Sequence, residues 1–482
     1  MTKNPKKINM TNYFKWAICA LCLLTVSANA QTNWGKPNIV FIMADDLGWG
    51  ELGCYGNDYN ETPNLDKLST QGLKFTQAYA AAPVCSPTRA SIMTGQFPAR
   101  VRITDFLPGN SNRYLDPKKY FTINEALSAQ GYHTGIIGKW HLDTQFDHPK
   151  GNPKQNGFDE VIGSETKYIA DGDYFYPYDK ISTFDKGEEN EYLTDRQCSE
   201  ASAFIERNKQ APFFLYLTFY SVHTKLDAPE DLVEKYKKKF DAKYGAGEAE
   251  KNYGPDNKKH LSDHKDNPYL AAMLERIDVG VGKIMETLEK TGLDKNTILV
   301  FFSDNGGAGK AGNNGILRAG KTWLYEGGIR ECLLVRWPGK IKPGTVTGEP
   351  MSSIDFYPTF QEIAGGKNQP GNLIDGKSIV PLLVKNQAPQ RDAFYWHYPS
   401  ETGKWKPRMA SAIRKGDYKL LQFYVDSRVE LYDLKNDPGE TKNLSAAMPE
   451  KVAELKQMLE QWKKDVNAEE PMMAAGEKRA EE

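Results

Sequence analysis

The chain has 482 residues, with 62 basic and 63 acidic side chains, 11% aromatic residues and six cysteines. The balanced charge and the aromatic content exclude an intrinsically disordered chain, and six cysteines in this length exclude a disulfide scaffold. A formal net charge of −1 gives no electrostatic footprint for nucleic acid, so we expect no nucleic-acid partner.

Residues 1–30 have the pattern of a secretory signal peptide. Four lysines precede an apolar run at 16–26, and residues 28–30 (ANA) form a small-x-small cleavage pattern before Gln31. The run is too short to span a bilayer comfortably, so we expect an exported, periplasmic or secreted protein without stable membrane insertion. Removing this segment removes four lysines and no acidic residue, which leaves the mature chain more acidic.

The six cysteines fall into two groups. Cys19 and Cys22 lie in the predicted signal peptide, where the large residues before them disfavour a lipobox and therefore a lipid anchor. The mature chain keeps Cys54, Cys85, Cys198 and Cys332. Their pairing stays open, but chemical use of Cys85 would leave three thiols, of which at least one is unpaired.

Beyond residue 30, predicted strands and helices alternate along the chain. Continuous apolar runs at 38–44, 212–220 and 297–303 predict strands buried on both faces, as in a parallel sheet. Shorter strands are predicted at 133–138 and 332–337. Capping residues, prolines and terminal glycines predict helices over 62–72, 123–130 and 267–291. This order predicts an α/β fold with a large mixed, mainly parallel sheet sandwiched by helices.

After about residue 389 the pattern changes to short strand candidates separated by polar turns. They lie at 393–397, 409–414, 418–423 and 429–433, and a helix is predicted over 449–464. We expect a smaller C-terminal antiparallel sheet packed by one helix. The predicted organisation is a catalytic domain over 31–388, a C-terminal subdomain over 389–467 and a flexible tail over 468–482. The charged segment 236–265 is predicted to be a solvated loop.

Four of the predicted strands end in polar residues that can carry chemistry. One such strand end would be an ordinary turn. Four together predict a site, because open α/β sheets bind ligands at the carboxyl ends of their strands. The residues are Asp45 and Asp46, Lys139 and His141, His223, and Asp304 and Asn305.

Cys85 begins a short motif, Cys85-Ser86-Pro87-Thr88-Arg89. Pro87 suits the first turn of a helix, which would direct its free N–H groups and its positive dipole end at residue 85 and at a bound anion. Arg89 adds a fixed positive charge one turn along. A cysteine in this place is a candidate nucleophile, and the alternative is a buried structural cysteine.

The motif and its continuation to Gly95 resemble the signature of the type I, formylglycine-dependent sulfatases of the alkaline phosphatase-like superfamily. Further motifs follow the order of that family, and the resemblance extends from about residue 36 to 464. Among its members, the chain resembles exported bacterial polysaccharide sulfatases. The matching segments are 45–50 (DDLGWG), 131–141 (GYHTGIIGKWH), 303–307 (SDNGG), 320–330 (GKTWLYEGGIR) and 430–434 (ELYDL).

This resemblance implies that a formylglycine-generating maturation enzyme converts Cys85 to formylglycine (3-oxoalanine). One hydroxyl of the formylglycine hydrate attacks the sulfur of a sulfate ester, and the alcohol departs. Loss of a proton from the other hydroxyl then expels sulfate and restores the aldehyde, so catalysis is covalent.

The resemblance also implies a metal site made of Asp45, Asp46, residue 85, Asp304 and Asn305. Its oxygen donors suit one Ca²⁺, the family norm, or less favourably Mg²⁺, and argue against zinc.

The remaining implied site residues are cations and histidines. Arg89, Lys139 and Lys321 would neutralise the sulfate and the charge that develops on it. His141 would be the base that acts on the hydrate, and His223 would donate a proton to the leaving alkoxide or hold the sulfate.

The expected substrate is a sulfated polysaccharide or oligosaccharide, such as a marine algal ulvan or galactan, or a glycosaminoglycan. Loops at 103–106, 168–178 and 395–398 combine aromatic and polar residues, which suits sugar rings. Two alternatives remain open. One is a phosphoester or phosphonate hydrolase of the same superfamily, and the other is a sulfated-glycan-binding protein in which Cys85 is never matured.

Overall fold

The computed structural model describes residues 1–2, 34–108, 111–143, 150–164, 174–178, 181–184, 186–254, 260–400 and 406–471. The predicted signal peptide lies outside the described residues except for residues 1 and 2. Most of the predicted tail (472–482) and part of one predicted substrate loop (168–173) also lie outside them.

A nine-stranded sheet, counted over the described residues, lies at the centre of the fold in the order β4-β3-β5-β1-β6-β7-β2-β8, with β9 paired to β2. Strand β7 runs antiparallel to both β6 and β2, and the other pairs are parallel. The predicted mixed, mainly parallel sheet is confirmed. Its strands are β1 (Asn38–Ala44), β2 (Leu73–Tyr79), β3 (His133–Gly138), β4 (Glu160–Ile162), β5 (Phe213–Thr218), β6 (Thr297–Ser303), β7 (Arg330–Arg336), β8 (Thr345–Thr347) and β9 (Met351–Ser352).

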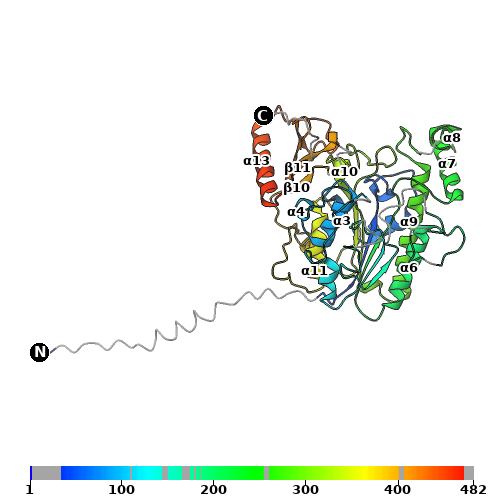
Figure 1. The fold of residues 1–482 in the computed structure, drawn as a ribbon, viewed down its shortest axis with the longest axis horizontal. Coiled ribbons are helices and arrows are strands. Elements are labelled where there is room, and N and C mark those ends of the chain that lie inside the picture. The colour runs from blue at the N-terminus through cyan, green and yellow to red at the C-terminus, as the bar shows by residue number, and fades with distance from the viewer. Residues whose placement is uncertain are drawn as a thin grey trace.

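Helices cover both faces of this sheet (Figure 1). Each face has its own apolar core, because alternate side chains of β1, β5 and β6 point to opposite sides. One core includes α2 (Pro63–Gln71), α6 (Leu193–Arg207) and α9 (Pro268–Lys290). The other includes α3 (Cys85–Thr94), α5 (Ile123–Ser128), α11 (Phe356–Ile363) and α12 (Val380–Lys385).

Short elements complete the larger unit. They are the helices α4 (Pro98–Val101) and α10 (Glu326–Ile329) and the 3₁₀ turns η1 (Gly53–Tyr55), η2 (Asp294–Asn296) and η3 (Ser353–Asp355).

A second, four-stranded antiparallel sheet follows, with its strands in chain order. Helix α13 packs on one of its faces through Leu455, Leu459 and Trp462 (Figure 1). The predicted C-terminal antiparallel sheet and helix are confirmed, whereas the exact boundary at 388/389 stays a prediction. The elements are β10 (Phe394–Tyr398), η4 (Lys406–Arg408), β11 (Ala410–Lys415), β12 (Tyr418–Phe423), β13 (Val429–Asp433) and α13 (Pro449–Asp465).

The segment 236–265 differs from its prediction as a solvated loop. It contains the end of α7 (Glu230–Tyr244) and all of α8 (Glu248–Tyr253). Tyr236 and Phe240 are buried, and their spacing of four residues places both on one face of α7. The sequence prediction missed this apolar stripe because charged residues dominate the segment.

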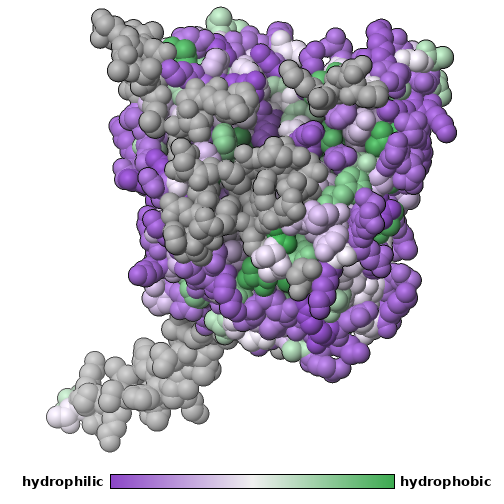
Figure 2. Space-filling model, turned by 45° about the vertical axis from the view of Figure 1, so that its right-hand side comes forward, coloured by the Kyte–Doolittle hydropathy of each residue, from purple (hydrophilic) through white to green (hydrophobic). Residues whose placement is uncertain are grey.

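Most of the face shown in Figure 2 that is not grey is hydrophilic, with small separate hydrophobic areas. Across the described residues, the structure contains no helix with the length and apolarity needed to span a bilayer.

A buried ion network joins the two sheets. Lys419 of β12 is fully buried, and its Nζ lies 2.9 Å from Oε1 of Glu326 and 3.0 Å from Oε1 of Glu440. Glu326 also accepts a hydrogen bond from the Tyr79 hydroxyl at 2.6 Å. Because a buried carboxylate without its partner is strongly unfavourable, this lysine is needed for the stability of the junction.

We expect Lys419→Met to lower the free energy of unfolding by about 3–5 kcal/mol, because it removes the buried cation that the Glu326 and Glu440 carboxylates share. Chemical denaturation measures the change. Lys415→Met is the matched control, since Lys415 pairs with Glu454 at 2.7 Å while 42% of its side chain is exposed. The control should change stability by about 1 kcal/mol or less. Equal effects of the two substitutions would contradict the prediction.

Candidate active site

The residues predicted at the strand ends meet at one edge of the large sheet. Asp45 directly follows β1, Lys139 directly follows β3, and Asp304 directly follows β6. Strand β1 pairs in parallel with β6 on one side and with β5 on the other, and β5 pairs in parallel with β3. The carboxyl ends of β1, β3 and β6 therefore lie at the same edge of the sheet. His223 lies five residues beyond the end of β5.

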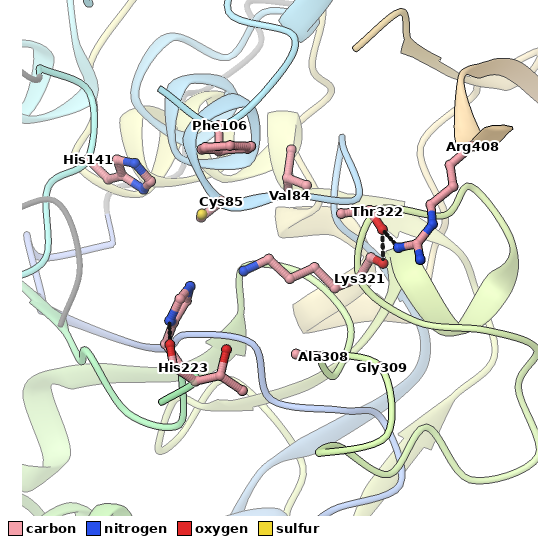
Figure 3. Close-up of a pocket in the computed structure, with 11 residues that line it drawn as sticks. Val84, Cys85, Phe106, His141, His223, Ala308, Gly309, Lys321, Thr322 and Arg408 are labelled. Atoms are coloured by element: carbon pink, nitrogen blue, oxygen red, sulfur yellow. Dashed lines mark hydrogen bonds between the residues drawn. The ribbon is translucent and has the colours of Figure 1, made fainter. Parts of the chain in front are cut away.

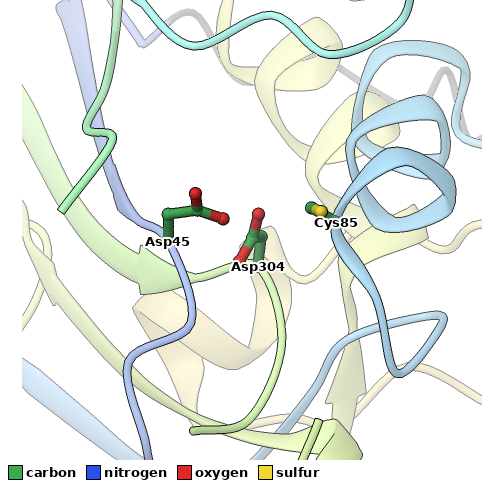
Figure 4. A group of neighbouring side chains, drawn as sticks. All are labelled: Asp45, Cys85 and Asp304. Atoms are coloured by element: carbon green, nitrogen blue, oxygen red, sulfur yellow. The ribbon is translucent and has the colours of Figure 1, made fainter. Parts of the chain in front are cut away.

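Cys85 is the first residue of α3 and is only 2% exposed. Its Sγ and one carboxylate oxygen each of Asp45 and Asp304 all lie within 4.8 Å of one another (Figure 4). The N-terminus of a ten-residue helix favours negative charge at this position. Burial nevertheless raises the pKa of the Cys85 thiol above its ordinary value, and Lys139 and Lys321 only partly oppose this effect.

Arg89 and Lys139 bind the Asp304 and Asp45 carboxylates that lie beside Cys85. Arg89 donates to Oδ2 of Asp304 from Nε at 2.9 Å and from Nη2 at 2.7 Å. Lys139 Nζ donates to Oδ2 of Asp45 at 2.5 Å. Both cationic side chains are fully buried, so they contribute strong fixed charges to the floor of the site.

Asp46 is hydrogen-bonded to both Lys321 and Asn305. Its Oδ2 accepts a hydrogen bond from Lys321 Nζ at 2.7 Å, and its Oδ1 accepts one from Asn305 Nδ2 at 2.8 Å. Burial and the nearby carboxylate of Asp46 act in opposite directions on Lys321, and its pKa is raised above the ordinary value. The three aspartates are therefore matched by three cations.

This group of residues fits a divalent cation. Oδ1 of Asp45 and Oδ1 of Asn305 are buried and accept no hydrogen bond from the described part of the chain. Burial and the charge of Asp45 raise the pKa of Asp304 to about 7. Burial opposes ionisation of Asp45 as well, but the surrounding positive charges, Lys139 first, together outweigh it and lower the pKa of Asp45. A hard cation among these oxygens would accept the orphaned lone pairs and relieve the repulsion.

A hydrogen bond to the backbone fixes which ring nitrogen of His141 carries the hydrogen. Its Nε2 lies 3.1 Å from the carbonyl oxygen of Leu107, which can only accept, so Nε2 carries the hydrogen. Nδ1 of the neutral ring is then the basic nitrogen. Burial and Lys139 lower the pKa of His141 well below its ordinary value, so the ring is neutral near pH 7.

His223 faces Asp46 across the site, with Nε2 lying 3.6 Å from Oδ2 of Asp46. Its Nδ1 is bonded to the carbonyl oxygen of Thr224, so Nδ1 carries the hydrogen. Burial and Lys321 lower the pKa of His223 to about 4. Tyr174 donates a hydrogen bond to the backbone carbonyl of His223 at 3.0 Å and thereby fixes this turn.

Three residues of the site have a left-handed backbone conformation, which is uncommon for residues other than glycine. The φ angles are 59° at Asp46, 55° at His141 and 74° at Thr322. Such strain persists only where the surrounding structure enforces it, and it concentrates at functional sites.

A cavity of about 440 Å³ opens above these residues (Figure 3). Of the predicted site residues, Cys85, His141, His223 and Lys321 line it, whereas Arg89 and Lys139 do not. The full lining is Val84, Cys85, Phe106, His141, His223, Thr224, Ala308, Gly309, Lys321, Thr322 and Arg408.

The three predicted substrate loops differ in their relation to the cavity. Phe106 of the loop 103–106 lines it. In the segment 395–398, Tyr395 stacks on Trp462 at 4.9 Å, and none of these four residues lines the cavity. Of the loop 168–178, the described residues 174–178 do not line it either.

Sequence reasoning missed several lining residues. Thr322 lies within the motif at 320–330, and Ala308 and Gly309 directly follow the motif at 303–307, so the sequence could have indicated these three. Arg408 could not, because it comes from η4 of the second sheet unit and belongs to no motif.

Comparison with known families decides the identity of the chain. The Sulfatase family model matches residues 37–366. The chain belongs to the sulfatase family. A second model, described as N-sulphoglucosamine sulphohydrolase, C-terminal, matches residues 317–466 of this sulfatase.

Relatives of the sulfatase match it over most of their lengths. Steryl-sulfatase of Rattus norvegicus is 31% identical and covers 84% of this chain and 81% of its own. A sulfatase of Formosa agariphila is also 31% identical, over 91% of this chain and 90% of its own. The crystal structure of Ps i-CgsB has a TM-score of 0.75 and 31% identity, over 90% of this chain and 94% of its own. The same protein has been solved in complex with k-i-k-neocarrahexaose.

These matches confirm the resemblance drawn from the motifs and the predicted enzyme class. The protein is a sulfatase, a hydrolase of sulfate esters, and the phosphoester alternative lacks comparable support.

Proposed function

We propose that this sulfatase removes sulfate from a sulfated carbohydrate, with formylglycine at position 85 and one calcium ion. The observation that carries the proposal is the placement of Cys85 at the N-terminus of α3, on the wall of the cavity and within 4.8 Å of the Asp45 and Asp304 carboxylates. A nucleophile, a cation site and proton-transfer groups therefore converge on one point.

The buried state of Cys85 supports its conversion to formylglycine by a maturation enzyme. A thiol whose pKa is raised is protonated at neutral pH and is a poor nucleophile. When present, the hydrated formylglycine supplies a hydroxyl group that attacks sulfur and a second hydroxyl that allows sulfate to be released. The helix N-terminus stabilises negative charge on these oxygens.

The cation would be held by Asp45, Asp46, Asp304 and Asn305, together with the oxygen at position 85. Calcium is preferred over magnesium for a site of several carboxylate and amide oxygens. When bound, it supplies Lewis-acid polarisation of a sulfate oxygen. Because three aspartates already balance three cations, a divalent ion leaves surplus positive charge that attracts an anionic ester.

The cationic side chains divide into two roles. Lys321 lines the cavity and holds a sulfate oxygen directly. Arg89 and Lys139 lie below the cavity, where they fix the Asp304 and Asp45 carboxylates and add their charge to the field at the sulfate.

The two histidines move protons. His141 accepts the proton of the formylglycine hydrate at Nδ1, while its Nε2–H remains on the Leu107 carbonyl. His223 lines the cavity and carries its hydrogen at Nδ1, so it acts as the acid only after Nε2 has taken up a proton from solvent, which it then delivers to the departing alcohol oxygen. The Asp46 carboxylate, 3.6 Å away, stabilises the protonated ring that this step requires.

A carbohydrate substrate is supported by the cavity and by the relatives. The cavity combines an aromatic wall, Phe106, with hydroxyl and cationic groups, as sugar sites do. Ps i-CgsB binds the oligosaccharide k-i-k-neocarrahexaose. With an N-terminal export signal cleaved before Gln31, the enzyme would act on sulfated polysaccharide outside the cytoplasm, such as an algal galactan or ulvan.

A substrate panel tests this function. The matured enzyme is assayed with desalted sulfated galactan and ulvan oligosaccharides, an aryl sulfate, a steryl sulfate and an aryl phosphate, and free sulfate or phosphate is measured. We expect kcat/KM for at least one oligosaccharide to exceed that for the aryl and steryl sulfates, with phosphate release far lower. A preference for the steryl sulfate, or a dominant phosphatase rate, would contradict the proposal.

A further inference from the structure

Two consecutive backbone N–H groups beside the active site are bonded to buried side chains. The N–H of Phe106 donates to Oδ1 of Asp105 at 2.8 Å, and the N–H of Leu107 donates to Oγ of Ser86 at 3.1 Å. Ser86, Asp105 and Leu107 are fully buried, whereas Phe106 lines the cavity (Figure 3). The backbone at this point of the cavity wall is therefore held from inside the protein.

Leu107 connects Ser86 to the predicted base, His141. Its carbonyl oxygen lies 3.1 Å from Nε2 of His141, while its N–H is bonded to Ser86 and its side chain packs in the apolar core that includes α3. With the N–H and the side chain both fixed, the direction of the carbonyl is fixed as well. Since a carbonyl only accepts, that direction decides where the His141 ring lies and which nitrogen carries its hydrogen.

The second sheet supports the same segment. The hydroxyl of Tyr398, the last residue of β10, donates to Oδ1 of Asp105 at 3.2 Å, and the Ser400 hydroxyl donates to Oδ2 at 3.3 Å. Both residues are fully buried. Asp105 therefore keeps Phe106 in place, and Ser86 is the contact that reaches Leu107 from the catalytic helix.

Ser86 directly follows Cys85 in the first turn of α3. The side chain of residue 85 reaches the cavity, whereas Oγ of Ser86 accepts from Leu107. One peptide bond and two hydrogen bonds thus connect the nucleophile at position 85 to His141. A general base must lie within hydrogen-bond reach of the proton that it removes, so a small displacement of either group lowers the rate.

We infer that Ser86 is a positioning residue for the reaction: by holding Leu107, it fixes the place and the tautomer of His141 relative to position 85. Neither Ser86 nor Leu107 lines the cavity, so the effect falls on the chemical step and not on substrate binding. The inference rests on the proposed role of His141 as the base. It does not depend on the identity of the alcohol, so an aryl sulfate serves as the substrate.

A double-mutant cycle of Ser86→Ala and His141→Ala tests it. Each rate is divided by the fraction of formylglycine that mass spectrometry finds at position 85, because Ser86 lies in the motif around that residue. We expect Ser86→Ala to lower kcat by about 10–100-fold with KM within about twofold of the parent, and His141→Ala to lower kcat by about 10²–10⁴-fold. Adding Ser86→Ala to His141→Ala should cost almost nothing further, because residues that act as a unit are not additive. Ser86→Thr keeps the acceptor oxygen and should recover most of the loss.

The control is Ser91→Ala, which removes a buried hydroxyl from the same helix. Oγ of Ser91 donates to the Thr88 carbonyl at 2.7 Å and is bonded to the Ser353 hydroxyl at 2.7 Å, so it has no part in holding Leu107. This variant should keep the parental kcat.

Four results would overturn the inference while the base role of His141 stands. They are a parental kcat in Ser86→Ala, an equal loss in Ser91→Ala, an equal cost of Ser86→Ala with and without His141, and no recovery in Ser86→Thr. A parental rate in His141→Ala would instead overturn the proposed base and this inference with it.

Discussion

Replacing Cys85 with alanine should lower kcat for any sulfate ester by roughly 10⁴–10⁶-fold, the scale of loss when a covalent nucleophile is removed. The residue lies at the start of α3, beside the carboxylates and the cavity, and an alanine there can carry no oxygen nucleophile. Arg89 and Lys321 remain, so sulfated ligand should still bind. A rate assay with an aryl sulfate, together with a binding assay with a sulfated oligosaccharide, separates the two effects.

Cys54→Ala is the matched control, because Cys54 is a second free thiol that does not line the cavity. It should retain the parental rate. Persistence of most of the activity in Cys85→Ala would show that another group attacks sulfur. Equal and substantial loss in both variants would instead point to a general effect of removing a thiol on the fold.

Calcium should stabilise the parent enzyme but not the Asp304→Asn variant. The Asp45 and Asp304 carboxylates converge in a buried site, and orphaned oxygens of Asp45 and Asn305 are available as ligands. A ligand at one hundred times its Kd stabilises the folded state by about 2.7 kcal/mol. Loss of one charged ligand should weaken calcium binding by more than about 100-fold, since even outer-shell changes cost 10–100-fold.

The measurement is the melting temperature after chelation and after readdition of calcium or magnesium, with sulfatase activity followed in parallel. Asp375→Asn is the control, because Asp375 also accepts two hydrogen bonds from an arginine, Arg100, at 2.9 Å each but lies outside the cation group. The control should respond to calcium as the parent does. A parent whose melting temperature and activity are unchanged by chelation would contradict the metal site.

The parts of the fold that were predicted well carry strong local signals. The bounds of β1, β3 and β6 agree with the sequence prediction because their apolar or glycine-rich runs end sharply at polar residues. Strand β2 (Leu73–Tyr79) was missed because its alternation of apolar and polar residues is broken at Thr76 and Gln77, where its pairing with β7 shifts register. Helix α6 was missed because Gln197 and Ser202 are buried on its inner face and interrupt its apolar stripe. In both cases tertiary burial overrides the local pattern.

The site was predictable to the extent that its residues lie in short motifs at strand ends. The sheet topology then places Asp45, Lys139 and Asp304 side by side. The motifs do not indicate how deeply each side chain is buried. That Arg89 and Lys139 are fully buried and do not line the cavity is therefore known only from the structure. Arg408 reaches the cavity through the packing of the second sheet against the first, a contact between segments far apart in the chain.

Mass spectrometry of the peptide that contains residue 85 tests the central claim most directly. Enzyme co-produced with a formylglycine-generating enzyme, and enzyme produced without one, are digested and compared with their specific activities. The account predicts an aldehyde in place of the thiol, in a fraction that rises in proportion to the activity. A preparation that is fully active while residue 85 remains an intact cysteine would contradict it.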